Sequence, residues 1–246
     1  MQVMNLLDRY GRQARLYPAV LILCPLLVIP AVNALAENLA TVSMASAALV
    51  AIGYGLTHLV RTLGKRIEEK LFARWGGPPT TRMLRWSDST LDETTKARYH
   101  AYLRGRNLTM PTPAEERADA QRADEQIESA VSWLRNNRRE EHTYRLVHIE
   151  NAAYGFRRNM FGAKPLGVAI ACVVIAFGVF NALPITSAWG QELAPPMLSP
   201  TPTLFALTVG LTALMFWVCI VTQSWVRAAA EVYAKTLLGT CDTAAQ

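Results

Sequence analysis

The stretch from Pro165 to Gln191 decides the fold, and it reads PLGVAIACVVIAFGVFNALPITSAWGQ, without Lys, Arg, Asp or Glu. An α-helix needs about 20 apolar residues to cross a bilayer core of about 30 Å, so this stretch can span a membrane. Three further stretches lack charge in the same way: Leu16–Ala36, Asn38–Val60 and Leu193–Val226. The pattern predicts an all-α, polytopic membrane protein with four transmembrane helices.

The charge-free stretches form two predicted hairpins around an insert. The helices are expected near Tyr17–Ala36 and Leu39–Val60, then near Leu166–Ser187 and Thr203–Val226. The expected domains are 1–60 (N-terminal segment and first hairpin), 61–164 (helical insert), 165–226 (second hairpin) and 227–246 (C-terminal tail). Only 18% of the 246 residues are charged, against about a quarter in soluble domains. Because charged residues are missing altogether from four long stretches, the sequence excludes a disordered chain, a disulfide scaffold and an ordinary soluble enzyme.

The basic residues predict the orientation. Three arginines precede the first span, twenty basic residues lie between Arg61 and Lys164, and Arg227 and Lys235 follow the last span, which accounts for all 25. The two short connections carry only Glu37 and Glu192. Because positive residues stay on the cytoplasmic side, both termini and the insert are expected in the cytoplasm of a bacterium, with the spans in its inner membrane.

The insert is predicted to be mainly helical. The second span is expected to continue to Arg74 and to stop at Trp75-Gly-Gly-Pro-Pro79. Capping boxes at Thr90–Glu93 and Thr112–Glu115 predict two helix starts, the second helix running to about Asn136. The stretch Thr143–Ile149 is compatible with a strand or a helix, so the structure of residues 140–150 stays open.

The sequence offers no catalytic centre, cofactor site or metal site. The spans hold no carboxylate, Lys or Arg, and His58 stands alone near the end of the second span. His142, His148 and Glu150 match no zinc signature, and the four cysteines lack metal-ligand spacing. A nucleotide-processing enzyme would need that histidine cluster to bind a metal. The net charge of +6 follows from the topology and from contact with lipid head groups, so nucleic acid is a disfavoured partner.

Small residues recur along one face of the second span, at Ser43, Ala47, Ala51 and Gly55. Such spacing lets helices approach closely in lipid, and it predicts packing within the chain or in a homo-oligomer. The hydroxyls of Thr41, Ser43 and Ser46 border this face. They can line a pore, or they can bond to carbonyls of their own helix.

Arginines beside aromatic residues are the candidate sensing residues. Arg82, Arg85 and Trp86 follow the Gly-Gly-Pro-Pro turn, and Arg157 and Arg158 precede the third span. Guanidinium groups suit a phosphate-bearing ligand or a cytoplasmic protein partner. For Asn151–Lys164 the alternative is ordinary anchoring at the membrane surface.

Four segments carry a resemblance: Arg9–Pro18, Phe72–Thr81, Lys96–His100 and Tyr154–Asn159. There the chain resembles an uncharacterised family of bacterial four-span inner-membrane proteins. Its layout is also loosely similar to membrane effectors of antiviral defence systems. The family has no agreed activity, but the similar layout implies a homo-oligomeric channel or effector with a cytoplasmic sensor domain, which disrupts the membrane in antiphage defence. The lack of a catalytic motif predicts that the protein is not an enzyme. The alternative is a non-conducting membrane scaffold that recruits a soluble partner.

Overall fold

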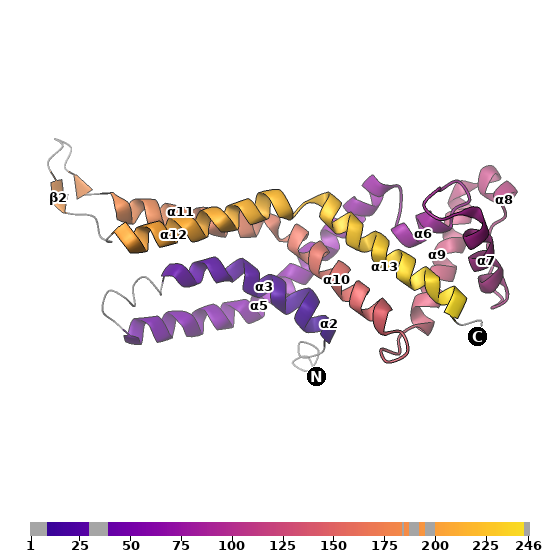
Figure 1. The fold of residues 1–246 in the computed structure, drawn as a ribbon, viewed down its shortest axis with the longest axis horizontal. Coiled ribbons are helices and arrows are strands. Elements are labelled where there is room, and N and C mark those ends of the chain that lie inside the picture. Colours follow the sequence, from indigo (N-terminus) through magenta and orange to yellow (C-terminus); the bar gives the residue numbers. More distant parts are fainter. Residues whose placement is uncertain (1–8, 30–38, 184, 187–191, 195–199, 244–246) are drawn as a thin grey trace. The chain divides into compact units, whose positions relative to one another are not determined.

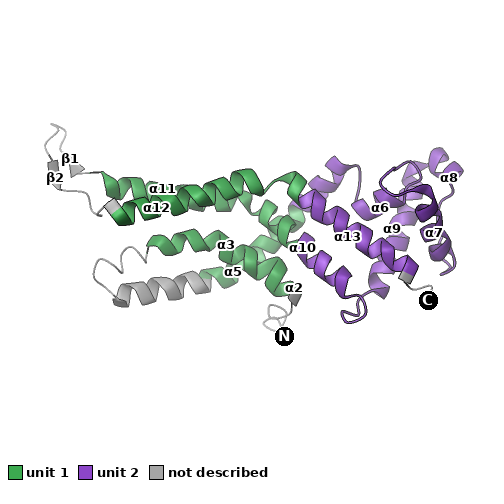
Figure 2. Ribbon diagram, viewed as in Figure 1, with its two compact units in different colours: residues 1–66, 155–225 green, residues 67–154, 226–246 purple. Residues whose placement is uncertain are grey.

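The computed structural model describes residues 9–29, 39–183, 185–186, 192–194 and 200–243, and it is helical apart from one short strand pair (Figure 1). The chain divides into two compact units (Figure 2). Unit 1 comprises residues 1–66 and 155–225, and unit 2 comprises residues 67–154 and 226–246. The divisions fall inside helices α5 (Leu39–Trp75), α10 (Arg145–Gly162) and α13 (Gln223–Thr243).

Unit 1 contains the charge-free stretches. Besides parts of α5, α10 and α13, its elements are α2 (Arg9–Gly11), the π-helix η1 (Arg12–Leu16), α3 (Tyr17–Leu23), the 3-10 helix η2 (Cys24–Leu27), α11 (Lys164–Ala182), β1 (Ile185–Thr186), β2 (Glu192–Ala194), α12 (Pro200–Met215) and the π-helix η3 (Phe216–Ile220). The two strands pair antiparallel. Proline lacks an amide hydrogen, so Pro18 and Pro25 interrupt the regular bonding between residues 12 and 27.

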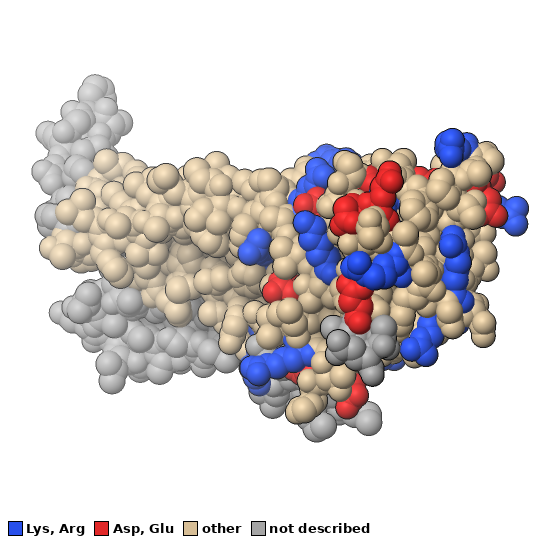
Figure 3. All heavy atoms as spheres, turned by 45° about the vertical axis from the view of Figure 1, so that its right-hand side comes forward, with Lys and Arg blue, Asp and Glu red and all other residues tan. Residues whose placement is uncertain are grey.

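Two helical stretches, Lys164–Ala182 and Thr201–Ile220, are long and apolar enough to cross a membrane by length and composition. Large apolar side chains on them are exposed, among them Phe180 at 65% and Leu204 at 63%. Figure 3 shows this surface without Lys, Arg, Asp or Glu. These two helices support membrane association.

The first predicted hairpin falls partly outside the described residues. Residues 30–38, which include the end of its first helix and its turn, lie there, as do the side chains of residues 39–51. The fourth helix ends earlier than predicted: η3 stops at Ile220 and α13 begins at Gln223. The Thr222 hydroxyl accepts a hydrogen bond from the Trp225 amide, so it caps the start of α13 and separates the two helices.

Glycines let α11 and α12 pack closely. A Cβ at Gly178 would lie 3.0 Å from the Leu207 side chain, and one at Gly210 would lie 2.6 Å from Ile175. At the other end of α11, a Cβ at Gly167 would lie 2.0 Å from the buried Trp217 ring of η3. Bare backbone at these positions is what brings the two apolar helices together.

Unit 2 is a helical body with its own apolar core. Besides parts of α5, α10 and α13 it contains α6 (Pro79–Leu84), α7 (Glu93–Arg104), α8 (Pro113–Ala118) and α9 (Ala120–Asn137). One face of α9 supplies Ile127, Val131 and Leu134 to the core, as their helical spacing predicts. Residues 227–246, expected as a tail, form helix up to Thr243, and Leu237 and Leu238 lie in this core.

The structure tests the predicted helix ends. The stop after Trp75 is confirmed: Gly76 and Gly77 have positive φ, and the Gly77 amide donates to the Phe72 carbonyl. The box at Thr112–Glu115 is confirmed, with both of its hydrogen bonds present. The box at Thr90 is wrong, because Asp92 caps α7 through the Thr95 amide.

Two further expectations for unit 2 are settled by local bonding. The predicted helix from Thr112 to Asn136 is interrupted at Asp119, which leaves the helical conformation and caps α9 through the Arg122 amide. Residues 145–149, left open between strand and helix, belong to α10.

Candidate functional site

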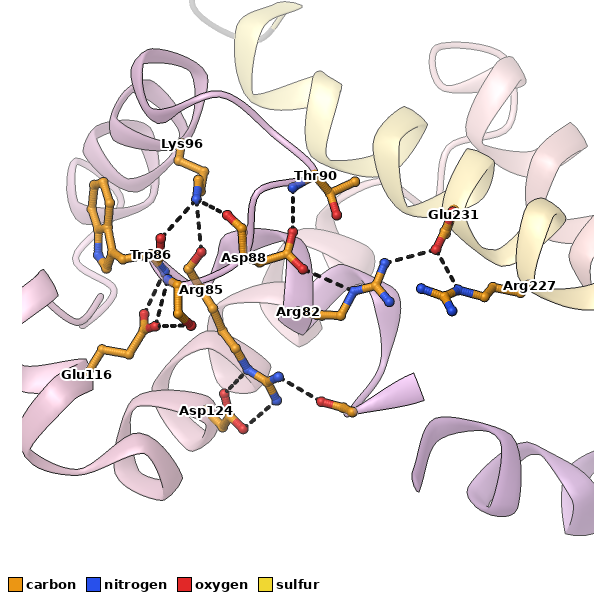
Figure 4. Close-up of polar contacts among 12 residues, drawn as sticks. Arg82, Arg85, Trp86, Asp88, Thr90, Lys96, Glu116, Asp124, Arg227 and Glu231 are labelled. Atoms are coloured by element: carbon orange, nitrogen blue, oxygen red, sulfur yellow. Dashed lines mark hydrogen bonds and ion pairs between the residues drawn. The ribbon is translucent and has the colours of Figure 1, made fainter. Parts of the chain in front are cut away.

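The predicted sensing residues of unit 2 lie at the end of α6 and in the segment that follows it. Arg82 belongs to α6, whereas Arg85 and Trp86 begin the turn toward α7. Figure 4 shows that side chains from several helices converge on residues 85–88. We call residues 85–88 the strap. The side chains that hold it form the clasp: Arg82, Arg85, Lys96, His100, Glu116, Asp124 and Glu231.

Arg85 is bound on both edges of its guanidinium. Its Nε and Nη2 donate to the two carboxylate oxygens of Asp124 on α9, each at 2.7 Å, and Nη1 donates to the Gly76 carbonyl at 2.7 Å. These hydrogen bonds to Asp124 raise the pKa of Arg85 above its ordinary value. A Cβ at Gly77 would lie 2.8 Å from Arg85 Nη2, so glycine at 77 is needed for this geometry.

Arg82 joins the strap to the C-terminal helix. Its Nε lies 3.2 Å from Asp88, and its Nη2 donates to Glu231 of α13 at 2.9 Å. Glu231 also accepts from Arg227. Burial raises the pKa of Glu231, but the hydrogen bonds from Arg227 and Arg82 outweigh burial, so the pKa lies below its ordinary value.

Glu116 of α8 holds the strap from a third side, and sequence analysis did not single it out. Its carboxylate accepts hydrogen bonds from the amides of Trp86 (2.6 Å) and Ser87 (2.9 Å) and from the Ser87 hydroxyl (2.6 Å). Burial raises the pKa of Glu116, yet these hydrogen bonds outweigh it and bring the pKa below its ordinary value. Glu116 therefore satisfies backbone donors that no secondary structure engages.

Lys96 of α7 is the buried cation of the clasp, with 1% of its surface exposed. Its ammonium group donates to the carbonyls of Arg85 (3.1 Å), Trp86 (3.2 Å) and Asp88. An ammonium group has three donors, and all three are used here. The sequence predicted no role for Lys96, which was named only as part of the segment Lys96–His100 that carries a family resemblance. Neither periodicity nor charge in the sequence marks this lysine as buried.

His100, one turn after Lys96, completes the clasp. Its Nε2 donates to the Leu84 carbonyl at 2.8 Å, and its ring lies 4.6 Å from the Trp86 ring. The Trp86 indole nitrogen in turn donates to the Pro111 carbonyl. Burial lowers the pKa of His100, so its neutral form is favoured in the folded protein.

The arrangement fixes the path of the strap. Arg82 and Arg85, predicted to sense a ligand, direct their guanidinium groups at carboxylates of unit 2 itself. Buried and half-buried charges that are paired and hydrogen-bonded in this way specify one conformation. Their contribution in this structure is structural, and ligand binding by Arg82, Arg85 and Trp86 stays a prediction.

The other two predicted sensing residues lie in unit 1. Arg157 donates to the Trp225 carbonyl at 3.1 Å, with its guanidinium 5.1 Å from the Trp225 ring centre. Arg158 is buried and donates to the side chain of Asn159. Nearby, Lys164 donates to the Val221 carbonyl, next to the end of η3. Arg157 and Lys164 therefore connect the segment 157–164 to the segment 221–225.

The predicted small-residue face is described at one position only. The side chains of Ser43, Ala47 and Ala51 lie outside the described residues. Gly55 is exposed, and a Cβ placed on it would meet no atom within 4 Å. Within unit 1, Gly55 therefore makes no close helix contact, and packing against another copy or lining of a pore stays a prediction.

Within the part of the chain that the structure describes, no three His, Cys, Asp or Glu side chains lie close enough together to hold a metal ion. The cysteines at 24, 172, 219 and 241 are free thiols. Burial raises the pKa of Cys241 to about 12, so this thiol is protonated and unreactive at neutral pH.

No family model, no curated protein and no solved structure matches this chain.

Proposed function

We propose that this chain is a four-span protein of the bacterial inner membrane with both termini in the cytoplasm. It assembles as a homo-oligomer and acts as a channel or membrane effector, whose conduction is controlled by the cytoplasmic unit 2, in antiphage defence. Arg82, Arg85, Trp86, Arg157 and Arg158 are its candidate sensing residues for a phosphate-bearing ligand or a protein partner.

One observation carries the proposal: three helices have residues in both units. α5, α10 and α13 each begin in one unit and end in the other. A helix transmits displacement along its axis because its backbone hydrogen bonds are continuous. Rearrangement of the clasp in unit 2 would thus act on helices that continue among the apolar helices of unit 1.

The exposed apolar surface of α11 and α12 supports the membrane part of the proposal. Transmembrane helices present such side chains to lipid, and water is an unfavourable neighbour for them. The two charge-free stretches Leu16–Ala36 and Asn38–Val60, together with the positive-inside pattern, support two further spans and so a total of four.

Conductance of reconstituted protein tests the function. Full-length protein is inserted into liposomes that contain a potential-sensitive dye. The wild type is compared with Glu116→Gln and Arg85→Lys, which weaken the hydrogen bonds of the clasp but keep a polar side chain of similar size at each position. We expect the clasp variants to dissipate a potassium gradient at least about tenfold faster than the wild type, since an equilibrium shift of about 1.4 kcal/mol changes a population tenfold.

The control is Glu128→Gln, which removes from an exposed position of α9 the same negative charge that Glu116→Gln removes from the clasp. If correctly inserted wild type and both clasp variants leave the gradient intact, the channel proposal is refuted. That result would favour the alternative, a non-conducting scaffold that recruits a soluble partner. The exposed apolar side chains of Leu146 and Val232 on unit 2 are the observation that supports this alternative.

A further inference from the structure

The net positive charge belongs to unit 1. Unit 1 holds nine basic and three acidic residues, whereas unit 2 holds sixteen of each. The whole net charge of +6 therefore lies on the unit that contains the charge-free stretches. Two of the three acidic residues, Glu37 and Glu192, are separated in sequence from every basic residue by a charge-free stretch.

The basic segments of unit 1 meet at one level. Asn159 donates to the Ala14 carbonyl at 2.6 Å, which joins the segment around 157–164 to the segment around 12–15. A Cβ at Gly64 would lie 2.0 Å from Asn159, so the segment 61–66 of α5 reaches the same place. Basic residues at 12, 15, 61, 65, 66, 157, 158 and 164 thus gather at one end of the apolar helices.

Four exposed residues share one face of α5 in the region where the basic segments meet. They are spaced by four, three and four positions, which is the spacing of one helix face: Tyr54, His58, Arg61 and Lys65. The opposite face packs into unit 1 through Leu56, Val60 and Gly64. We call the four exposed residues the outer α5 face.

The outer α5 face changes from aromatic to basic along the helix axis. Ile52 (57% exposed) and Leu59 (46%) are exposed on another side of α5, about 130–150° around the helix from this face. On the outer α5 face itself, the Tyr54 and His58 rings contact each other edge to face. Arg61 and Lys65 follow. At a rise of 1.5 Å per residue, His58 and Lys65 are about 10 Å apart along the axis. A bilayer adds about 5–8 Å of polar headgroup region on each side of its core, a similar depth.

We propose that the outer α5 face binds the phosphate groups of anionic phospholipids, with Arg61 and Lys65 as the phosphate ligands and Tyr54 and His58 at the edge of the acyl region. The inference rests on the proposed membrane placement of unit 1 and is independent of conduction. An aromatic ring followed by basic residues at the end of an apolar helix is the arrangement that fits a lipid surface. The next carboxylates along α5, Glu68 and Glu69, already belong to unit 2, which limits the basic band to this level.

Lipid binding by full-length protein tests the proposal. Protein is purified in a neutral detergent, depleted of lipid and titrated with phosphatidylglycerol or phosphatidylcholine, and bound lipid is counted by native mass spectrometry. We expect a preference for phosphatidylglycerol that falls about tenfold or more in the double variant Arg61→Gln/Lys65→Gln, since each cation near an anionic surface strengthens binding severalfold. The conservative variant Arg61→Lys/Lys65→Arg should keep the preference.

The matched control is Arg135→Gln/Lys235→Gln, which removes one Arg and one Lys from exposed positions of the electrically neutral unit 2. Equal lipid binding by the wild type and the Arg61/Lys65 variant would overturn the proposal, as would an equal loss in the control. Competition by millimolar inorganic phosphate would also overturn it, because the site would then take a free anion. If unit 1 does not enter membranes, the wild type will stay soluble without detergent. Solubility therefore distinguishes failure of the proposed membrane placement from failure of the lipid-binding proposal.

Discussion

The side-chain amide of Asn159 donates a hydrogen bond of 2.6 Å to the backbone carbonyl of Ala14. In a regular α-helix that carbonyl would accept from the amide four residues later, but residue 18 is proline and has no amide hydrogen. Asn159 supplies the missing donor, while its side-chain oxygen accepts from the buried Arg158. The buried side-chain amide of Asn159 thus joins η1 to α10 and also accepts a hydrogen bond from the buried Arg158 guanidinium.

Replacement of Asn159 by alanine should destabilise unit 1 strongly. The change leaves the Ala14 carbonyl without this donor and removes a partner of the buried Arg158, at a cost of about 2–4 kcal/mol. The measurement is the unfolding of detergent-solubilised protein followed by circular dichroism. Asn136→Ala, at an exposed position of α9, should change stability by less than about 0.5 kcal/mol. Equal stability of both variants would show that the bond contributes nothing.

Gly64→Ala and Gly55→Ala form a matched pair on α5. A Cβ at Gly64 would lie 2.0 Å from Asn159 Oδ1 and 2.9 Å from its Cα, so the helices must separate and about 2 kcal/mol or more should be lost. At Gly55 a Cβ meets no atom, and alanine should stabilise the monomer by about 0.5–1 kcal/mol through helix propensity. Unfolding of both variants in one detergent gives the comparison. A tolerated Gly64→Ala would contradict the close crossing of α5 and α10.

Replacement of Lys96 by methionine should loosen the strap of unit 2. Methionine fills a similar volume but removes a donor from three carbonyls, of which that of Arg85 keeps the Asp88 amide, and the loss costs about 2–4 kcal/mol. Hydrogen exchange followed by mass spectrometry should show faster exchange in peptides that cover residues 84–88. Lys235→Met removes an exposed charge on α13 and serves as the control. Unchanged exchange in the Lys96 variant would mean that Glu116 and His100 hold the strap without it.

The stability of unit 2 should fall in two stages as the pH decreases. His100 has a folded-state pKa below its ordinary 6.5, so the unfolded state binds a proton first and stability falls as the pH drops below about 6.5. Glu116 and Glu231 have folded-state pKa values below 4.5, so their stabilising effect is present above 4.5 and is lost as the pH drops through those lower values. One proton corresponds to at most about 1.4 kcal/mol per pH unit.

Denaturant titrations between pH 8 and about pH 3 measure this profile, since the second stage lies below pH 4.5. His100→Gln keeps a donor for the Leu84 carbonyl and cannot titrate, so the decline between pH 6.5 and 4.5 should shrink in this variant. A wild-type curve that rises on acidification in that window would contradict the neutral, buried state of His100.

Reporter fusions test the four-span topology directly. Alkaline phosphatase inserted at residue 37 or residue 192 should be active, because both connections are expected outside the cytoplasm. A green fluorescent reporter placed after residue 246 or within residues 105–108 should fluoresce, as it does only in the cytoplasm. An inactive phosphatase at 37 combined with an active one at 192 would leave two spans, Lys164–Ala182 and Thr201–Ile220.

Local signals in the sequence predicted much of the helical layout. The Gly-Gly-Pro-Pro stop at 76–79 and the box at Thr112 were found because their residues act on the backbone beside them. The start of α7 was misplaced by two residues, since Thr90 and Asp92 are both good caps and tertiary context selects Asp92. The break at Asp119 was not predicted because Ile127, Val131 and Leu134, whose spacing indicated the helix, all lie after it.

The clasp escaped sequence analysis for a different reason. Lys96 and Glu116 look like solvated charges on helices, and their partners are backbone groups 8–11 and 29–30 residues away. Backbone donors and acceptors carry no sequence signal of their own, so no pattern of residue types marks these contacts. Arg82 and Arg85 were noticed as a cluster, but the carboxylates that engage them, Asp124 and Glu231, lie 39 and 149 residues further along the chain.

The sequence by itself determined which stretches of the chain can lie in lipid. Charged side chains are costly to transfer into a bilayer, and their absence over about twenty residues can be recognised from the sequence alone. It also determined the sign of the total charge. Only the tertiary structure decided how that charge is divided: packing assigns Arg61, Lys65, Arg157 and Lys164 to unit 1, and it leaves unit 2 with equal numbers of acidic and basic residues. The division depends on which distant helices bury their faces together, and side-chain packing settles that only after the chain has folded.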